Sequence, residues 1–176
     1  DINDHYTASF ENEPDRIQKA MIVCSNRQIA YNLLLKFKEK YPEWFVEKKV
    51  SEGTTATQAE LNELKPMPFI AMVASVGSND KPEMYNYLGG VANDKRSKEL
   101  DAAFKQEKSN FHIVVVVDMW ITGFDVPCLT YLYNDKPLKK HLLIQTISRV
   151  NRVYPGKDYG MVIDYIGIRE NMREAM

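Results

Sequence analysis

Four polar side chains lie on one face of a helix that is predicted in the last third of the chain. The helix is expected over residues 138–153, and His141, Gln145, Arg149 and Arg152 follow at offsets of 0, 4, 8 and 11. A guanidinium group stays charged and binds two oxygens at once, so Arg149 and Arg152 could stabilise charge on a transferring phosphoryl group. The alternative is a solvated basic face with no chemical role.

A glycine-containing turn precedes this helix in the sequence. The stretch D-M-W-I-T-G-F-D-V-P covers residues 118–127, and its Gly123 would let the backbone approach a phosphate closely because it has no side chain. Thr122 and Asp125 stand beside this glycine and can form hydrogen bonds. An ordinary exit from a strand, shaped by Gly123 and Pro127, is the other interpretation.

A third polar group follows the apolar run at residues 20–24. Ser25, Asn26 and Arg27 stand where a helix should begin, and the N–H groups of a helix amino terminus can meet a phosphate. A plain helix cap explains Ser25 and Asn26 equally well. Positive charge is also concentrated further on, since residues 134–157 contain six Lys or Arg and one Asp. Some of that charge could face DNA phosphates.

An open α/β sheet is predicted to position these groups. Apolar runs alternate with amphipathic or charged helical segments, and this order implies a parallel sheet with crossover helices. We expect all three polar groups beyond the carboxyl ends of the strands, where ligands gather in such sheets. The expected strands are 20–24, 69–73, 112–117, 129–133 and 161–166, and the expected helices are one closed by Pro42, one at 94–106 and one at 138–153.

Two of these helices show an apolar face that should pack on the sheet, and the third should turn Leu100 and Phe104 inward. The stretches 43–67 and 75–87 are polar, and the second is expected as a surface loop, where function often sits. The expected packing residues are Ile29, Leu33, Phe37 and Tyr41 on the first helix, and Leu143, Ile144, Ile147 and Val150 on the last.

The bulk composition is typical of a single domain, with 176 residues of which 44% are hydrophobic. The net charge of -1 excludes a histone-like polycation, so nucleic-acid contacts must come from charge placement. Cys24 and Cys128 stand in apolar stretches and are expected as reduced core residues of an intracellular protein. The absence of a long apolar run or signal peptide predicts a cytoplasmic protein without membrane contact, and the opening without methionine predicts a piece of a longer polypeptide.

Together these motifs resemble those of superfamily 2 helicases, and specifically the motor subunit of type I restriction-modification enzymes. K-A-M-I-V-C-S-N-R from Lys19 resembles the family's motif IV, D-M-W-I-T-G-F-D-V-P from Asp118 its motif V, and Q-T-I-S-R-V-N-R from Gln145 its motif VI. L-Y-N-D-K-P-L-K-K-H-L-L-I and V-I-D-Y-I-G also look like family signatures. The likeness covers residues 19–170, although residues 43–64 match no family feature.

The resemblance implies a RecA-like (P-loop NTPase-type) open parallel sheet flanked by helices and lacking its own Walker A loop. Arg149 and Arg152 would act as arginine fingers on the γ-phosphate of ATP, organised by Gln145. Gly123 and Asp125 would contact the nucleotide or relay its state. The implied contacts to the DNA backbone are Ser25, Asn26, Arg27 and Thr122.

The resemblance also implies a domain organisation. Residues 1–18 would be a linker or entering segment, 19–168 the second motor domain, and 169–176 the start of a following helix. The sequence contains neither a G-x-x-x-x-G-K-[ST] loop nor a D-E-x-H run, so ATP and Mg would be held mainly by the first RecA-like domain, and this chain would bind no metal itself.

The implied partners are duplex DNA, the nuclease and first RecA-like domain of the same subunit, and the modification and specificity subunits. The complete subunit would be an ATP-dependent type I site-specific deoxyribonuclease, whereas the isolated chain is expected to be inactive. Two other functions stay open. The chain could be a DNA-binding or scaffolding module whose arginines only contact phosphates, or the motor domain of another superfamily 2 DNA translocase.

Overall fold

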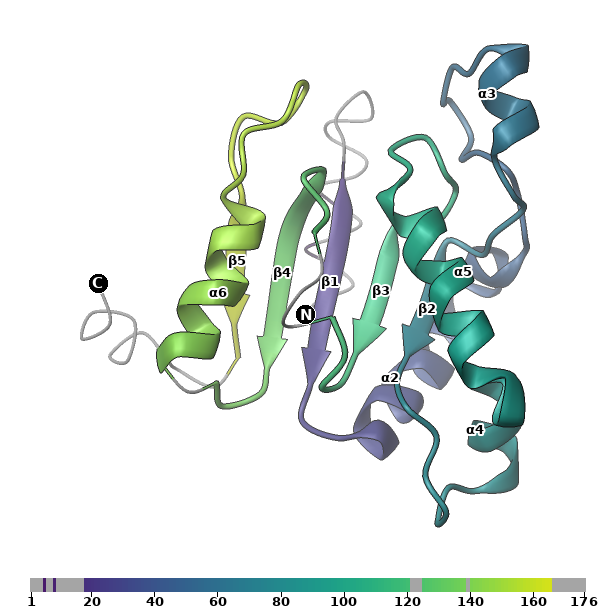
Figure 1. The fold of residues 1–176 in the computed structure, drawn as a ribbon, viewed down its shortest axis with the longest axis vertical. Coiled ribbons are helices and arrows are strands. Elements are labelled where there is room, and N and C mark those ends of the chain that lie inside the picture. Colours follow the sequence, from purple (N-terminus) through teal and green to yellow (C-terminus); the bar gives the residue numbers. More distant parts are fainter. Residues whose placement is uncertain (1–4, 6–7, 9–17, 121–124, 139, 166–176) are drawn as a thin grey trace.

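The computed structural model describes residues 5, 8, 18–120, 125–138 and 140–165 (Figure 1). Five strands form one parallel sheet in the order β2-β3-β1-β4-β5. The predicted open parallel sheet is therefore confirmed. The strands are β1 (Lys19–Cys24), β2 (Ile70–Val73), β3 (Ile113–Val116), β4 (Leu129–Asp135) and β5 (Met161–Asp164).

Helices cover both faces of the sheet (Figure 1). The helix α2 packs on one face with α4, while α5 and α6 lie on the other face. The α-helices of the described residues are α2 (Arg27–Lys40), α3 (Gln58–Glu63), α4 (Pro82–Tyr87), α5 (Asn93–Lys105) and α6 (Lys140–Val150), and the 3-10 turns are η1 (Pro42–Phe45) and η2 (Gly90–Ala92).

The strand β1 lies at the centre of the sheet and is buried along its whole length. Its side chains alternate between the faces, so that Met21 and Val23 pack toward α5 and α6, whereas Ile22 and Cys24 pack toward α2. The four valines and isoleucine of the neighbouring β3 segment 113–117 are buried on both faces, as their unbroken apolar run predicts. Cys24 and Cys128 are buried free thiols, which confirms their assignment to the core.

The predicted packing face of α2 is confirmed in part. Phe37 is buried, and Leu33 and Tyr41 pack against the core in partly buried positions, whereas Ile29 is 42% exposed. Ala30 and Leu34 are buried in addition, so the helix turns a slightly different side of its apolar arc to the sheet. The α6 helix shows the same effect, because Ile144 is 46% exposed and Thr146 takes an inward position, where its hydroxyl donates to Leu142 O at 2.6 Å.

Two short helices occupy the polar stretches 43–67 and 75–87, of which only the second was predicted to be a surface loop. The α3 helix begins with a capping box in which Thr57 accepts from Glu60 N, and the Glu60 carboxylate accepts from Thr57 N at 2.7 Å. The α4 helix begins with Pro82 at its first position, so residues 75–87 are not all loop. Both helices are too short to show apolar periodicity. The only local indications of them are the capping residues of α3 and the proline at the start of α4.

The outer edge of β2 is closed by side chains. Met72 donates its N–H to the Tyr87 hydroxyl at 3.1 Å and accepts from the Arg96 guanidinium at 3.0 Å. The guanidinium also lies 4.8 Å from the centre of the Tyr87 ring. These contacts occupy backbone groups that could otherwise pair with a strand of another molecule.

Lys19 is fully buried at the start of β1. Its ammonium donates to Gln106 O at 2.8 Å and to Phe111 O at 2.9 Å, and lies 5.0 Å from the Phe104 ring. Burial lowers the pKa of Lys19 from 10.5 to about 8. The carbonyl acceptors satisfy the ammonium, but the cost of removing its charge from water persists.

This burial predicts a pH-dependent stability. Between pH 8 and 10 the unfolded chain keeps the Lys19 proton while the folded chain loses it, so the free energy of unfolding should rise with pH. Relative to Lys19→Met, the wild-type chain should gain about 2 kcal/mol over this range. Urea unfolding at each pH measures the difference, and parallel pH profiles would contradict it.

Gly160 supplies a second stability test. An added Cβ would lie 2.0 Å from the backbone oxygen of Val150, where α6 passes the start of β5. Gly160→Ala should therefore lower the free energy of unfolding by about 2–4 kcal/mol. Gly53→Ala is the control, because Gly53 has a φ of +83° but open space around it, and should cost only about 1–2 kcal/mol. Equal losses in the two variants would show that the close approach to Val150 O adds no cost at Gly160.

Candidate functional site

A hollow of about 270 Å³ lies at the carboxyl ends of β1, β2 and β3. It is bounded by the first turn of α2 and by the residues that follow β2 and β3. The first N–H groups of a helix have no partner within the helix, so this wall can accept an anion. The lining residues are Ser25, Asn26, Arg27, Ala74, Ser75, Val117, Asp118 and Met119.

Ser25 and Asn26 lie in the hollow as predicted, and both side chains also serve the fold. Asn26 is the N-cap of α2, and its Oδ1 accepts from Ile29 N at 2.9 Å. The Ser25 hydroxyl donates to Asp135 O, which ties the start of α2 to the end of β4. The helix-cap interpretation is therefore confirmed for Asn26. The Ser25 hydroxyl donates its hydrogen to Asp135 O, and its oxygen can still accept a hydrogen bond.

Arg27 turns toward the loop after β2. Its Nη2 lies 2.9 Å from Asp80 Oδ1, and its Nη1 donates to Ser75 O at 3.2 Å. The Asp80 side chain is only 3% exposed, whereas the Arg27 side chain is 32% exposed, so the ion pair is buried on the Asp80 side and partly open on the Arg27 side. The prediction did not include Asp80 or Ser75, because their pairing with Arg27 joins residues 48 or more positions apart and has no local signal.

A second group of predicted residues meets at the opposite edge of the sheet. Arg152 Nη1 lies 2.6 Å from Asp125 Oδ2, with both side chains about half exposed. Asp125 comes just before β4, and Arg152 comes between α6 and β5, so both lie at the amino ends of the strands. The expectation that all predicted residues share the carboxyl edge is therefore wrong. A helix that joins two parallel strands runs back along the sheet, and its last turn must reach the amino edge.

The remaining predicted residues of α6 follow this direction. Gln145 is exposed in the middle of the helix, and Arg149 is partly exposed in its last turn, on the way to Arg152. His141 is exposed near the opposite end of the helix. Thr122 and Gly123 lie outside the described residues.

The connection between β3 and β4 contacts both ends of α6. Asp118 forms an ion pair with Lys136, just before α6, and Asp125 forms one with Arg152, just after it. Trp120 on this connection adopts a φ of 65°, a conformation that costs a bulky residue about 1–3 kcal/mol. Its ring packs 6.0 Å from that of Phe104. Asp118 of this connection therefore lines the hollow at one edge of the sheet, and Asp125 binds Arg152 at the other edge.

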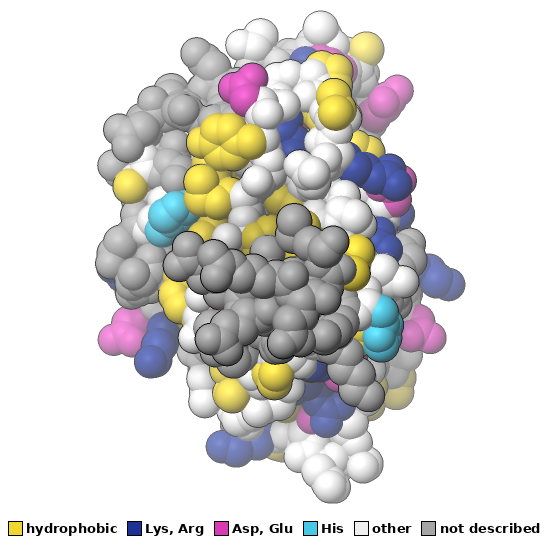
Figure 2. Space-filling model, turned by 90° about the vertical axis from the view of Figure 1, so that its left-hand side faces the viewer, with side chains coloured by type: hydrophobic (Ala, Val, Ile, Leu, Met, Phe, Trp, Pro, Cys, Tyr) yellow, Lys and Arg dark blue, Asp and Glu magenta, His cyan; other side chains and the backbone are white. Residues whose placement is uncertain are grey.

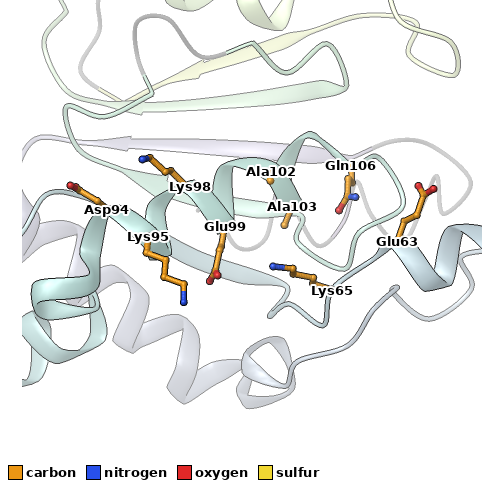
Figure 3. A pocket seen from close by; sticks show the side chains of 9 residues that line it. All are labelled: Glu63, Lys65, Asp94, Lys95, Lys98, Glu99, Ala102, Ala103 and Gln106. Carbon is orange, nitrogen blue, oxygen red and sulfur yellow. The ribbon is translucent and has the colours of Figure 1, made fainter.

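A larger hollow is a poorer candidate. It measures about 560 Å³ and lies along the exposed side of α5 (Figure 3). Three lysines and three acids line it, so their charges offset one another. Its residues are Glu63, Lys65, Asp94, Lys95, Lys98, Glu99, Ala102, Ala103 and Gln106.

Within the described ranges, no three His, Cys, Asp or Glu side chains are grouped as metal ligands would be. His112 stacks on Phe69 at 4.6 Å, and burial, with Lys19 nearby, lowers its pKa to about 3. A histidine that stays neutral in this way packs like an aromatic side chain and carries no charge at neutral pH. The helices of the described residues include none that is long and apolar enough to cross a membrane.

Comparison with solved structures shows the class of fold. The chain is similar to "Structure of Mss116p (NTE and C-tail double deletion) bound to ssRNA and AMP-PNP", with a TM-score of 0.52 and 17% identity over 93% of this chain and 24% of that one. It is also similar to "Mss116p DEAD-box helicase domain 2 bound to an RNA duplex", with a TM-score of 0.50 and 15% identity over 92% of this chain and 46% of that one. The fold is that of a RecA-like helicase domain.

Sequence comparison shows the family. The family described as "Type I restriction enzyme subunit R domain 3" matches residues 5–167, and the chain belongs to it. The HindI endonuclease subunit of Haemophilus influenzae is 34% identical over 89% of this chain, and a putative type I restriction enzyme MjaIXP endonuclease subunit of Methanocaldococcus jannaschii is 34% identical over all of it. The chain spans 13% and 14% of the length of these relatives.

The exposure of the Asp125–Arg152 pair predicts that it contributes little to stability. Asp125→Ala should change the free energy of unfolding by less than about 1 kcal/mol, as is usual for surface ion pairs. Leu143→Ala in the buried face of α6 should cost about 2–5 kcal/mol. Urea unfolding of both variants gives the comparison. A loss above about 2 kcal/mol for Asp125→Ala would indicate a mainly structural pair.

Proposed function

We propose that this chain is the second motor domain of a type I restriction subunit, and that it completes an ATP site formed mainly by the preceding domain. The observation that carries the proposal is the contact between Asp125 and Arg152. It brings two motif-like segments together at one exposed edge, although the residues are 27 positions apart. Arg152, and Arg149 one turn before it, would present guanidinium groups to the γ-phosphate.

The surroundings of Arg152 support a contact with another domain. Val153 is 97% exposed and Tyr159 is 47% exposed on the connection that follows α6. On this side of the molecule hydrophobic side chains reach the surface between charged ones (Figure 2). Apolar exposure beside a polar group is typical of an interface, and the first RecA-like domain of the same subunit is the proposed partner.

ATP and Mg would be held mainly by that partner, whose Walker elements this chain lacks. Bound ATP supplies the phosphoryl group that is transferred to water. This chain would contribute the guanidinium charge of Arg149 and Arg152, with Gln145 beside them. Asp125 would hold Arg152 extended at the edge, and a phosphate could replace Asp125 as its partner.

The hollow at the carboxyl edge is the proposed contact for one strand of duplex DNA. The first turn of α2 would bind a phosphate through backbone N–H groups, with Ser25 and Asn26 at its wall. Thr122 would belong to the same surface. Phosphate contacts of this kind carry no base preference, which suits a motor that moves along any sequence.

The two candidate sites lie at opposite edges of the sheet, so ATP hydrolysis at one edge would have to be coupled to DNA movement at the other. The α6 helix has 11 residues and is roughly 16 Å long, and it runs between the two edges of the sheet. Closure of the two motor domains on ATP would then shift both edges together, and repeated closure would pull DNA past the enzyme. In the complete subunit, a separate nuclease domain would cleave DNA, and the modification and specificity subunits would select the site. The enzyme would work in the cytoplasm, and the isolated chain would be inactive.

The finger role can be tested in the complete subunit. Arg149→Ala or Arg152→Ala should lower kcat for DNA-stimulated ATP hydrolysis by about 100-fold or more, because charge in the transition state loses its partner. The Kd for ATP should change by only a few fold. Steady-state hydrolysis and nucleotide titration measure the two quantities.

Lys98→Ala is the matched control, since it removes a positive charge from the exposed side of α5. It should leave kcat unchanged. If the arginine variants lose DNA affinity while kcat stays at the wild-type value, the chain is a DNA-binding or scaffolding module.

A further inference from the structure

Arg27 is held by contacts that a phosphate-binding arginine would not need. Besides Asp80 and Ser75 O, its guanidinium lies against Gly77, where an added Cβ would stand 2.2 Å from Nη2. Asp80 also binds the loop itself, since its Oδ2 accepts from Gly77 N at 2.7 Å. One carboxylate therefore joins the start of α2 to the loop 75–80.

The position of this loop gives the contact a role. Ser75 lines the hollow across from the first turn of α2, and Ser75, Ser78 and Asn79 are exposed. These side chains are polar and uncharged, as is common for contacts to a nucleic-acid backbone. Without the ion pair, a loop that lacks regular structure would lose its fixed place beside α2.

We propose that Arg27, Asp80 and Gly77 form a latch that positions the loop 75–80 as a second wall of the DNA-binding hollow, with Ser75 as a further phosphate contact. This inference rests on the proposed DNA-binding function. Arg27 acts through Asp80 and is a positioning residue, in place of the direct DNA contact that the motif suggested.

The sign of one substitution separates the two roles. Asp80→Asn removes a negative charge beside the hollow, so simple electrostatics predicts tighter DNA binding. The latch predicts the reverse, a loss of about 5- to 20-fold in affinity, because ordering the loop then opposes binding. Gly77→Ala changes no charge but displaces the guanidinium, and should give a similar loss.

Arg27→Lys gives an independent measurement. Lysine keeps the charge, so a direct phosphate contact would survive with most of its affinity. The latch needs the planar fork that bridges Asp80 and Ser75 O, so Arg27→Lys should weaken binding as much as Asp80→Asn. The slope of log Kd against log salt should stay at the wild-type value in Asp80→Asn and Gly77→Ala, whereas loss of a direct contact lowers it by about one.

The experiment measures binding of a short fluorescent duplex of arbitrary sequence to the complete restriction subunit at several salt concentrations. Thermal unfolding of each variant confirms that it is folded, and Asp101→Asn on α5 is the control with the same charge change. Weaker binding by Asp80→Asn, Gly77→Ala and Arg27→Lys supports the latch. Unchanged or tighter binding by Asp80→Asn, or retained affinity in Arg27→Lys, overturns it.

The same series keeps the two proposals apart. If the wild-type subunit shows no salt-dependent binding to the duplex, the proposed DNA-binding function itself fails. If the wild-type subunit binds and the latch variants bind equally well, only the latch fails. The single variant Ser75→Ala should also bind the duplex more weakly. If its affinity equals that of the wild-type subunit, Ser75 is not a phosphate contact.

Discussion

Parallel pairing of the strands is the constraint on which the rest of this structure depends. Each strand must begin at the same edge, so every connection has to travel back along the sheet before the next strand can start. The consequence is a division of chemistry between two edges. Residues that directly follow a strand collect around the hollow beside Ser25, and Asp125 and Arg152 meet in the connections that lead into β4 and β5.

This division would suit the proposed function, in which the domain contacts both a DNA strand and a nucleotide. Phosphates of a DNA strand and of a nucleotide would compete if they shared a basic surface, because both are recognised by the same donors. Placing the candidate sites at opposite edges, roughly 20 Å apart along β4, keeps them separate. A change at the nucleotide edge must then be transmitted across the sheet to affect DNA at the other edge. The helix α6 runs from one edge to the other, and an ion pair lies just outside each of its ends, Asp118 with Lys136 and Asp125 with Arg152.

Much of the fold could be predicted because β1, β2, β3 and β4 are buried almost throughout. Unbroken runs such as 113–117 leave little choice of structure, and their order along the chain requires crossovers. The short helices α3 and α4 were missed because six residues cannot show a helical period. The predictions of the inward faces of α2 and α6 were partly wrong, because spacing alone does not show which side of a wide apolar arc meets the sheet, and Ala30 and Thr146 are buried where Ile29 and Ile144 were expected.

The candidate site was predictable in its residue types and not in its arrangement. The motif likeness predicts Arg152 and Asp125, but the edge at which they meet depends on the direction in which α6 runs back along the sheet. The pairing of Arg27 with Asp80 could not be foreseen, since it brings together a helix start and a loop with no pattern in common. Long-range ion pairs of this kind depend on a tertiary arrangement that local spacing does not encode.

The two ion pairs that flank α6 share no residue, and they lie at different edges of the sheet. One acid stands on each side of the connection between β3 and β4, and each meets a basic residue just outside one end of the same helix. Pairs with an exposed partner contribute little to stability, so the domain should tolerate their replacement. The charge at one edge can therefore change through substitution without removing the ion pair at the other edge.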